Sequence, residues 1–152
     1  MNGLAMKTGA LGVAVGAAAA VALAPAASAA MGFGNFDLQI QRGTDYHTYV
    51  WAVTPCVNPA PDCRLITGIH RPIAGNVSYD GEAHLINGQW TLSVDIGEGL
   101  ICGGYYGQNI PTHDVFTWDP NTQVGNAASA SDIGCGGAPG GVINYPFVLT
   151  RL

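Results

Sequence analysis

The segment "YDGEAHLINGQWTLSVDI", residues 79–96, constrains the fold more than any other part of the chain. Asn87 and Gly88 separate two runs of alternating apolar and polar residues. Both tolerate the positive φ that a two-residue hairpin turn requires. Reading outward from the turn pairs the apolar residues: Leu85 with Trp90, Ala83 with Leu92, and Gly81 with Val94. The opposite face is polar and carries Glu82, His84, Gln89, Thr91, Ser93 and Asp95. The pattern predicts a hairpin with one face on a core and the other in water.

Other windows show the same period of two, and none shows a sustained helical stripe. The remaining predicted strands are 36–40, 46–53, 64–70, 99–106, 114–119 and 146–152. Clusters of Gly, Pro, Asn and Asp separate them, as turns do. The chain is therefore predicted to be all-β, a small antiparallel sandwich or barrel of about seven or eight strands. The weakly patterned residues 126–141 are expected to form a loop.

The first 29 residues are predicted to be a cleaved secretory signal, followed by a single β-domain at 30–152. Lys7 precedes an apolar Ala/Gly/Val-rich run, and "APAASAA" then offers an Ala-x-Ala cleavage site. The alternative is an uncleaved anchor, because the apolar run is almost long enough to span a bilayer. Pro25 and the cleavage site favour removal. The expected location is the cell envelope or the medium, with no stable membrane insertion after cleavage.

The four cysteines all lie in the predicted mature chain, at positions 56, 63, 102 and 135. An even number of cysteines in an exported protein is typical of disulfides. Three pairings are possible, and we favour Cys56–Cys63 and Cys102–Cys135 because the Pro-rich "VNPAPD" brings the ends of the first loop together. Zinc-type C-x₂-C pairs are absent. We therefore expect two disulfides, no metal and no cofactor.

The charge balance argues against nucleic acid as a partner. Without Lys7 the mature chain has four arginines against ten acidic residues, a net charge of −6. Nucleic acids and anionic membrane surfaces are bound through basic patches. A mostly neutral-polar, acidic surface suits a glycan or a protein partner better.

Signals of catalysis are weak. The serines at 78, 93, 129 and 131 lack the strained turn of a catalytic serine elbow. His113 and Asp114, with His84 as a further candidate, could form an acid–base or metal site, although a turn Asp beside an exposed His is the favoured interpretation of the pair. Carboxylate pairs for glycoside cleavage are available but cannot be placed at a working distance.

Three aromatic residues are candidates for ligand contact: Tyr105, Tyr106 and Trp118. Successive strand residues point to opposite faces, so alternation places at most one of the two tyrosines in the core. Tyr and Trp on an outer face provide rigid contact area with a polar tip. The competing interpretation is that Trp118 and one tyrosine belong to the core.

Several short motifs occur in a recognisable order: "WAVTPC", "NGQWTLSVD", "GLIC", "FTWDPNTQVG", "GCGG" and "YPFVLTRL". In this order they resemble a family of small exported proteins of mycobacteria and related actinobacteria. Members have a W-D-P turn, a late Cys-Gly and a terminal P-F-x-L strand. The resemblance spans residues 51–152 and implies export and a disulfide-stapled β fold. It supplies no catalytic residues, because the function of that family is uncharacterised.

These observations favour an exported, non-catalytic binding module for a glycan, an apolar ligand or a host protein. Its candidate contacts are Tyr105, Tyr106, Trp118, His113 and Asp114. One alternative is a small hydrolase that uses His113 and Asp114. Another is a protease inhibitor that presents the loop between Cys56 and Cys63.

Overall fold

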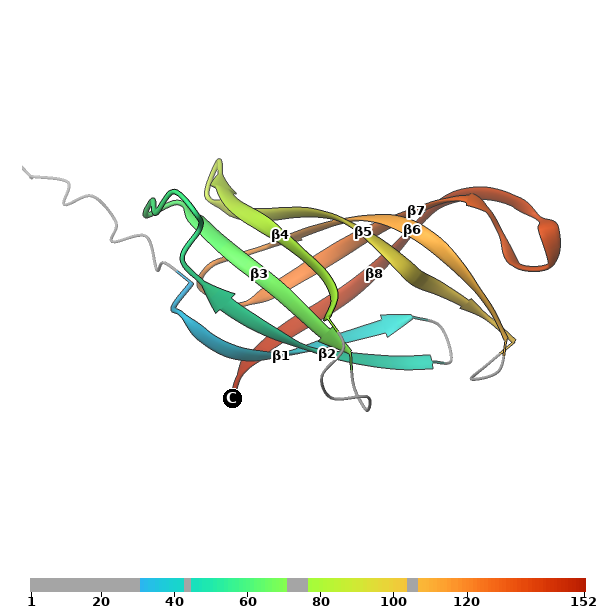
Figure 1. Ribbon diagram of the computed structural model, residues 1–152, viewed down its shortest axis with the longest axis horizontal. Helices are drawn as coiled ribbons and strands as arrows, with labels where there is room; N and C mark the ends of the chain where they lie inside the picture. Colours follow the sequence, from blue (N-terminus) through green and yellow to red (C-terminus); the bar gives the residue numbers. More distant parts are fainter. Residues whose placement is uncertain (1–30, 43–44, 71–76, 104–106) are drawn as a thin grey trace, which may run out of the picture.

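The computed structural model describes residues 31–42, 45–70, 77–103 and 107–152. Eight antiparallel strands follow one another in sequence order and close into a barrel (Figure 1). They are β1 (Gly34–Arg42), β2 (Asp45–Thr54), β3 (Cys63–His70), β4 (Val77–Ile86), β5 (Gln89–Cys102), β6 (Gln108–Trp118), β7 (Val124–Ile133) and β8 (Pro139–Arg151). The all-β prediction is confirmed, and of the two predicted architectures, sandwich and barrel, the structure is a barrel. Among the described residues no helix is long and apolar enough to cross a membrane.

Closure depends on the pairing of the first strand with the last. β1 and β8 run antiparallel from Phe36 opposite Arg151 to Ile40 opposite Phe147. Each strand therefore has a paired neighbour on both sides, although β4 and β5 pair only from Ile86 opposite Gln89 to His84 opposite Thr91. Because neighbouring strands alternate in direction, successive strand connections lie at opposite ends of the barrel.

We name each end after a buried arginine. The Arg64 end holds the connections β2–β3, β4–β5 and β6–β7 together with the two chain ends of the barrel. The Arg42 end holds the connections β1–β2, β3–β4, β5–β6 and β7–β8. Along β1 the odd-even alternation that buries Phe36 and Leu38 ends on Arg42 itself.

The predicted turn of the central hairpin forms, but the pairing of β4 with β5 ends at His84 opposite Thr91, so the predicted pairs Ala83–Leu92 and Gly81–Val94 lie beyond it. Asn87 and Gly88 have φ values of 51° and 82°, and Leu85 lies opposite Trp90. The predicted separate strand at 99–106 is wrong in its boundaries. Residues 99–102 continue β5, after a shift in its pairing with β6 between Ile96 and Leu100. The Gly residues there mark an irregularity within one strand rather than a break between two.

The loop expected at 126–141 is also wrong. β7 occupies Val124–Ile133, β8 begins at Pro139, and only a short turn with a 3-10 segment at Cys135–Gly137 separates them. The hairpin extends past the rest of the barrel, at the right in Figure 1. Alternation is present in β7 but uses small residues, with Ala127 and Ser129 turned inward, and so it gives a weak hydrophobic signal.

Aromatic rings fill the interior toward the Arg64 end. Trp51 meets Phe116 edge-on, with ring centroids 5.3 Å apart, and Trp90 stacks on Trp118 at 6.3 Å. The indole nitrogen of Trp51 donates a hydrogen bond to the hydroxyl of Tyr79 at 2.6 Å. An eight-stranded barrel is just wide enough for side chains to fill its interior, and here large rings do so.

Both predicted disulfides are confirmed. Cys56–Cys63 closes the β2–β3 connection at the Arg64 end, with Cα atoms 6.0 Å apart. Cys102–Cys135 ties the end of β5 to the β7–β8 connection, with Cα atoms 5.4 Å apart. One bridge therefore constrains each end of the barrel.

Candidate functional site: a buried polar cluster at the Arg42 end

The two polar residues predicted to act together, His113 and Asp114, lie on opposite sides of the barrel wall. Asp114 points inward and is fully buried, whereas the His113 side chain is 54% exposed on the outside. Successive residues of a strand must separate in this way. The structure therefore does not assemble an acid–base pair from these two side chains. His84 lies 3.8 Å from Glu82 on the outer surface.

The aromatic candidates also separate. Trp118 is buried in the core beside Trp90, so it offers no outer surface for a ligand. Tyr105 and Tyr106 lie outside the described residues. They belong to the connection between β5 and β6 and stay sequence-based candidates.

The inward-facing Asp114 binds Arg42, a residue that the sequence analysis did not single out. The Arg42 guanidinium donates to the Asp114 carboxylate, and Ser129 Oγ donates to the other carboxylate oxygen at 2.6 Å. A second guanidinium nitrogen donates to the backbone oxygen of Gly99 at 2.5 Å and to Ser129 Oγ at 3.3 Å. The Arg42 and Asp114 side chains are 6% and 0% exposed. This is a buried, hydrogen-bonded ion pair.

Aromatic hydroxyl-bearing side chains border the pair. The Tyr145 ring centroid lies 4.9 Å from the guanidinium carbon of Arg42, within cation–π range. Burial raises the pKa of Tyr49 to about 12, while the charge of Arg42 acts in the opposite direction. Burial likewise raises the pKa of Tyr145. A phenol is protonated at neutral pH even with its ordinary pKa of about 10, so both side chains can donate hydrogen bonds.

Two buried polar atoms beside the ion pair have no hydrogen-bond partner within the described part of the chain. They are Nε of Arg42 and Oγ1 of Thr112. Thr112 is 5% exposed, and a Cβ added at Gly99 would come within 1.8 Å of its hydroxyl. Most buried polar groups are hydrogen-bonded, and an orphan costs about 1–3 kcal/mol. We call Arg42, Thr112, Asp114, Ser129 and Tyr145 the Arg42 cluster.

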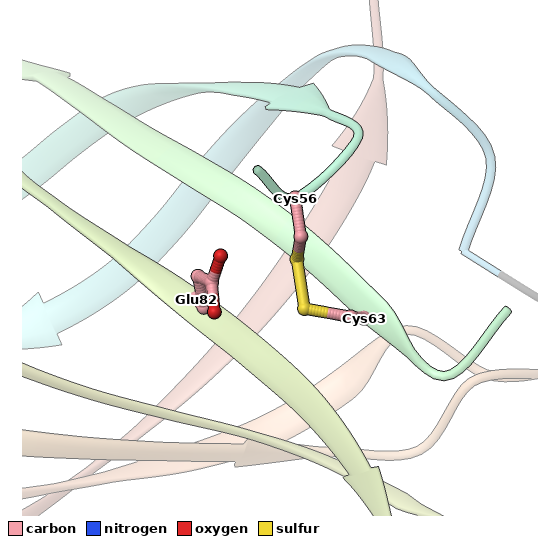
Figure 2. A group of neighbouring side chains, drawn as sticks. All are labelled: Cys56, Cys63 and Glu82. Atoms are coloured by element: carbon pink, nitrogen blue, oxygen red, sulfur yellow. A yellow bond between two sulfur atoms is a disulfide. The ribbon is translucent and has the colours of Figure 1, made fainter. Parts of the chain in front are cut away.

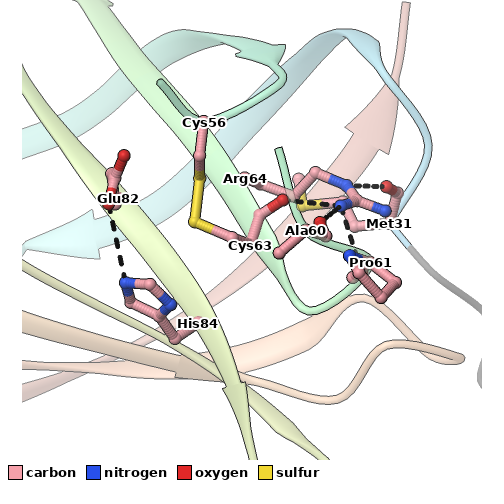
Figure 3. The surroundings of a disulfide bond; sticks show 8 residues. All are labelled: Met31, Cys56, Ala60, Pro61, Cys63, Arg64, Glu82 and His84. Carbon is pink, nitrogen blue, oxygen red and sulfur yellow. Dashed lines mark hydrogen bonds and ion pairs between the residues drawn. A yellow bond between two sulfur atoms is a disulfide. The ribbon is translucent and has the colours of Figure 1, made fainter. Parts of the chain in front are cut away.

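At the opposite end, the guanidinium of Arg64 finds hydrogen-bond acceptors within the protein (Figure 3). Its guanidinium donates to the backbone oxygens of Met31 at 2.8 Å and Cys63 at 2.6 Å, and to those of Ala60 and Pro61. The Phe33 and Trp90 rings lie 4.8 and 5.3 Å from the guanidinium carbon. Arg64 thus ties the N-terminal segment and the disulfide loop over this end of the barrel, which identifies it as a structural plug.

The disulfide Cys56–Cys63 and Glu82 place three potential metal ligands within 4.8 Å of one another (Figure 2). Zinc binds cysteine as thiolate. Both sulfur atoms here are bonded to each other, so in the oxidised protein only the Glu82 carboxylate is left as a ligand. The group is a structural disulfide beside the exposed carboxylate of Glu82.

Alternation along the strands could have identified the Arg42 cluster. Arg42 continues the inward series Phe36, Leu38, Ile40, and Asp114 precedes Phe116 with the same spacing. A charged residue at an inward position signals a buried partner. What alternation could not supply is which two inward charges meet.

Comparison of the chain with models of protein families, with curated proteins and with solved structures found no match. The resemblance to exported actinobacterial proteins therefore stays a prediction from the motifs, and the functional argument depends on the site itself.

Proposed function

We propose that the protein is an exported binding module that holds a neutral, hydroxyl-rich ligand, of the glycan class, at the Arg42 end of the barrel. The observation that carries the proposal is the pair of unpartnered buried atoms, Arg42 Nε and Thr112 Oγ1, beside a complete ion pair. One is a hydrogen-bond donor and the other both donates and accepts, which is the complement that a ligand hydroxyl needs.

Charge favours a neutral ligand over an anion. Asp114 already neutralises Arg42, so the Arg42 cluster carries no net charge to attract a carboxylate or phosphate. The mature chain is also acidic overall, and long-range repulsion disfavours anions. The Tyr145 ring adds an apolar face with a polar tip, which suits a sugar ring.

Export is part of the proposal. The leader-like first 29 residues support it, and the two disulfides fit an oxidising compartment. We propose that the mature protein acts in the cell envelope or outside the cell. Tyr105 and Tyr106 are proposed as additional contacts on the sequence argument that an exposed Tyr suits ligand recognition.

The test is calorimetric titration of the mature, oxidised protein with soluble neutral oligosaccharides released from bacterial envelope. Thr112→Val removes only the unpartnered hydroxyl at nearly constant shape, so the variant should fold as the wild type does. We expect saturable binding by the wild type and a loss of at least about tenfold in affinity for Thr112→Val, since a buried hydrogen bond is worth about 0.5–1.5 kcal/mol and an orphaned ligand group more.

Thr91→Val, on the outer face of β5, is the matched control and should bind normally. Equal binding by wild type and Thr112→Val would place the ligand elsewhere. Absence of heat with every neutral oligosaccharide, together with binding of anionic ones, would overturn the ligand class.

A second candidate function is protease inhibition through the disulfide loop. Residues 57–62 are all exposed, while Arg64 holds the backbone oxygens of Ala60 and Pro61 from inside. An exposed loop held rigid from within is the form that an inhibitor needs. Slowed peptide hydrolysis by a secreted serine protease, lost on reduction of the disulfide, would support it. Unchanged hydrolysis with a panel of such proteases would remove it.

A further inference from the structure

Three exposed side chains on the outer face of β5 and β6 form a continuous hydrogen-bonded chain. His113 Nε2 lies 2.9 Å from Ser93 Oγ, and His113 Nδ1 lies 2.7 Å from Asp95 Oδ1. The register explains the contact, because His113 stands directly opposite Asp95, and Ser93 is two residues earlier on the same face. Ser93 lies within β5 and not in the strained turn of a serine elbow, so the elbow motif does not identify it.

The two nitrogens of His113 face the partners that general-base chemistry requires. A carboxylate that accepts from Nδ1–H leaves Nε2 as the acceptor for the serine proton. The same order of contacts, carboxylate to Nδ1 and Nε2 to hydroxyl, activates serine on several unrelated folds and is recognised by geometry rather than by sequence position. Asp95 is the positioning residue in this arrangement and Ser93 the nucleophile.

We propose that Ser93 is an acyl-accepting nucleophile that reacts with small activated esters. Ser93 Oγ forms a bond to the acyl carbon as its proton moves to His113 Nε2. The bond from that carbon to the leaving oxygen then breaks, and Nε2 returns the proton to this oxygen. A water molecule, deprotonated by the same nitrogen, releases the carboxylic acid and restores the Ser93 hydroxyl.

Exposure sets the substrate class. The side chains of His113 and Asp95 are 54% and 90% exposed, and they stand on the outer wall of a barrel. The three residues supply a base and a nucleophile and no oxyanion donor. Esters with a good leaving group, which depend least on oxyanion stabilisation, are therefore the expected donors. The site lies on the opposite side of the barrel wall from the Arg42 cluster, so it is independent of the proposed ligand site.

The test is the steady-state hydrolysis of p-nitrophenyl acetate by the mature, oxidised protein. General-base catalysis contributes about 10²–10⁴-fold, so we expect Ser93→Ala and His113→Gln each to lose at least about tenfold in kcat/KM. Asp95→Asn should lower kcat and leave KM unchanged. A role of Asp95 in structure alone would change neither.

His84→Gln is the matched control, because His84 has a carboxylate neighbour, Glu82, at 3.8 Å, but among the described side chains no serine is hydrogen-bonded to its ring. It should retain the wild-type rate. Peptide mass spectrometry after an acid quench should find the acetyl group on Ser93, and circular dichroism should show every variant folded. A wild-type rate in folded Ser93→Ala, or an adduct on another residue, would overturn the proposal.

Discussion

Arg42 and Asp114 meet across the inside of the barrel, from two strands that are not neighbours. β1 pairs with β2 and β8, and β6 pairs with β5 and β7, so the ion pair crosses the interior rather than following the sheet. Arg64 shows the other solution to a buried guanidinium, since it donates its hydrogen bonds to backbone oxygens and lies against aromatic rings. The Asp114 carboxylate thus balances the charge of Arg42, whereas backbone carbonyl dipoles stabilise the charge of Arg64.

Asp114→Asn should destabilise the fold strongly, because it leaves the buried Arg42 charge unpaired. Breaking a buried pair from one side costs about 3–5 kcal/mol, whereas replacing both partners with apolar residues of similar size is often neutral. Arg42→Met with Asp114→Leu should therefore recover most of the loss. Urea unfolding gives the free energies, and Asp95→Asn on the outer face serves as the control. Equal stability of Asp114→Asn and wild type would show that the pair contributes nothing.

The two disulfides should differ in their contribution to stability. Constraint of the unfolded chain predicts about 2.5 kcal/mol for the short Cys56–Cys63 ring and about 4 kcal/mol for the Cys102–Cys135 ring. Replacing Cys102 and Cys135 with Ser should therefore lower the urea midpoint more than the same change at Cys56 and Cys63. The opposite order would mean that the β2–β3 loop and its contacts with Arg64 depend on their bridge more than chain entropy predicts.

Stability should fall in alkali because of buried phenols. Burial raises the pKa of Tyr49 to about 12, above the value of about 10 in an unfolded chain. The stabilisation is complete below pH 10 and is lost as the pH rises toward 12, since the unfolded state releases its protons first. Burial raises the pKa of Tyr79 as well, in the same direction.

Phenolate absorbance checks this directly. In the native protein the six tyrosines should titrate in at least two steps, and Tyr49→Phe should reduce the later one. In urea all should titrate together near pH 10. A single native step at that pH would contradict the expected burial of the Tyr49 phenol.

Gly125→Ala should destabilise the barrel by overpacking. A Cβ there would lie 2.4 Å from Phe147 Cζ and from the backbone oxygen of Thr117, and the backbone cannot easily yield. Overpacking costs about 1–3 kcal/mol. Gly141→Ala is the control, because nothing lies within 4 Å of its Cβ position. Thermal unfolding should separate the two, and equal melting temperatures would show that β7 can shift without cost.

The sequence by itself determined where most strands lie and, in the central hairpin, which face turns inward. Asn87-Gly88 dictates a turn, and alternation around it places Leu85 and Trp90 together before any distant contact is considered. The same local rule places Arg42 and Asp114 inside. It fails in β7, where inward Ala and Ser carry too little hydrophobicity to be distinguished from a loop.

Tertiary structure alone decided which inward and outward residues meet. Closure pairs β1 with β8, the first and last strands of the chain, the Arg42–Asp114 pair spans 72 positions, and the Ser93–His113 contact spans 20. A strand's alternation encodes the face of each side chain but not the strand that comes to stand opposite. That choice depends on the packing of the whole barrel, in which, for example, the Phe147 ring packs where Gly125 of β7 has no side chain.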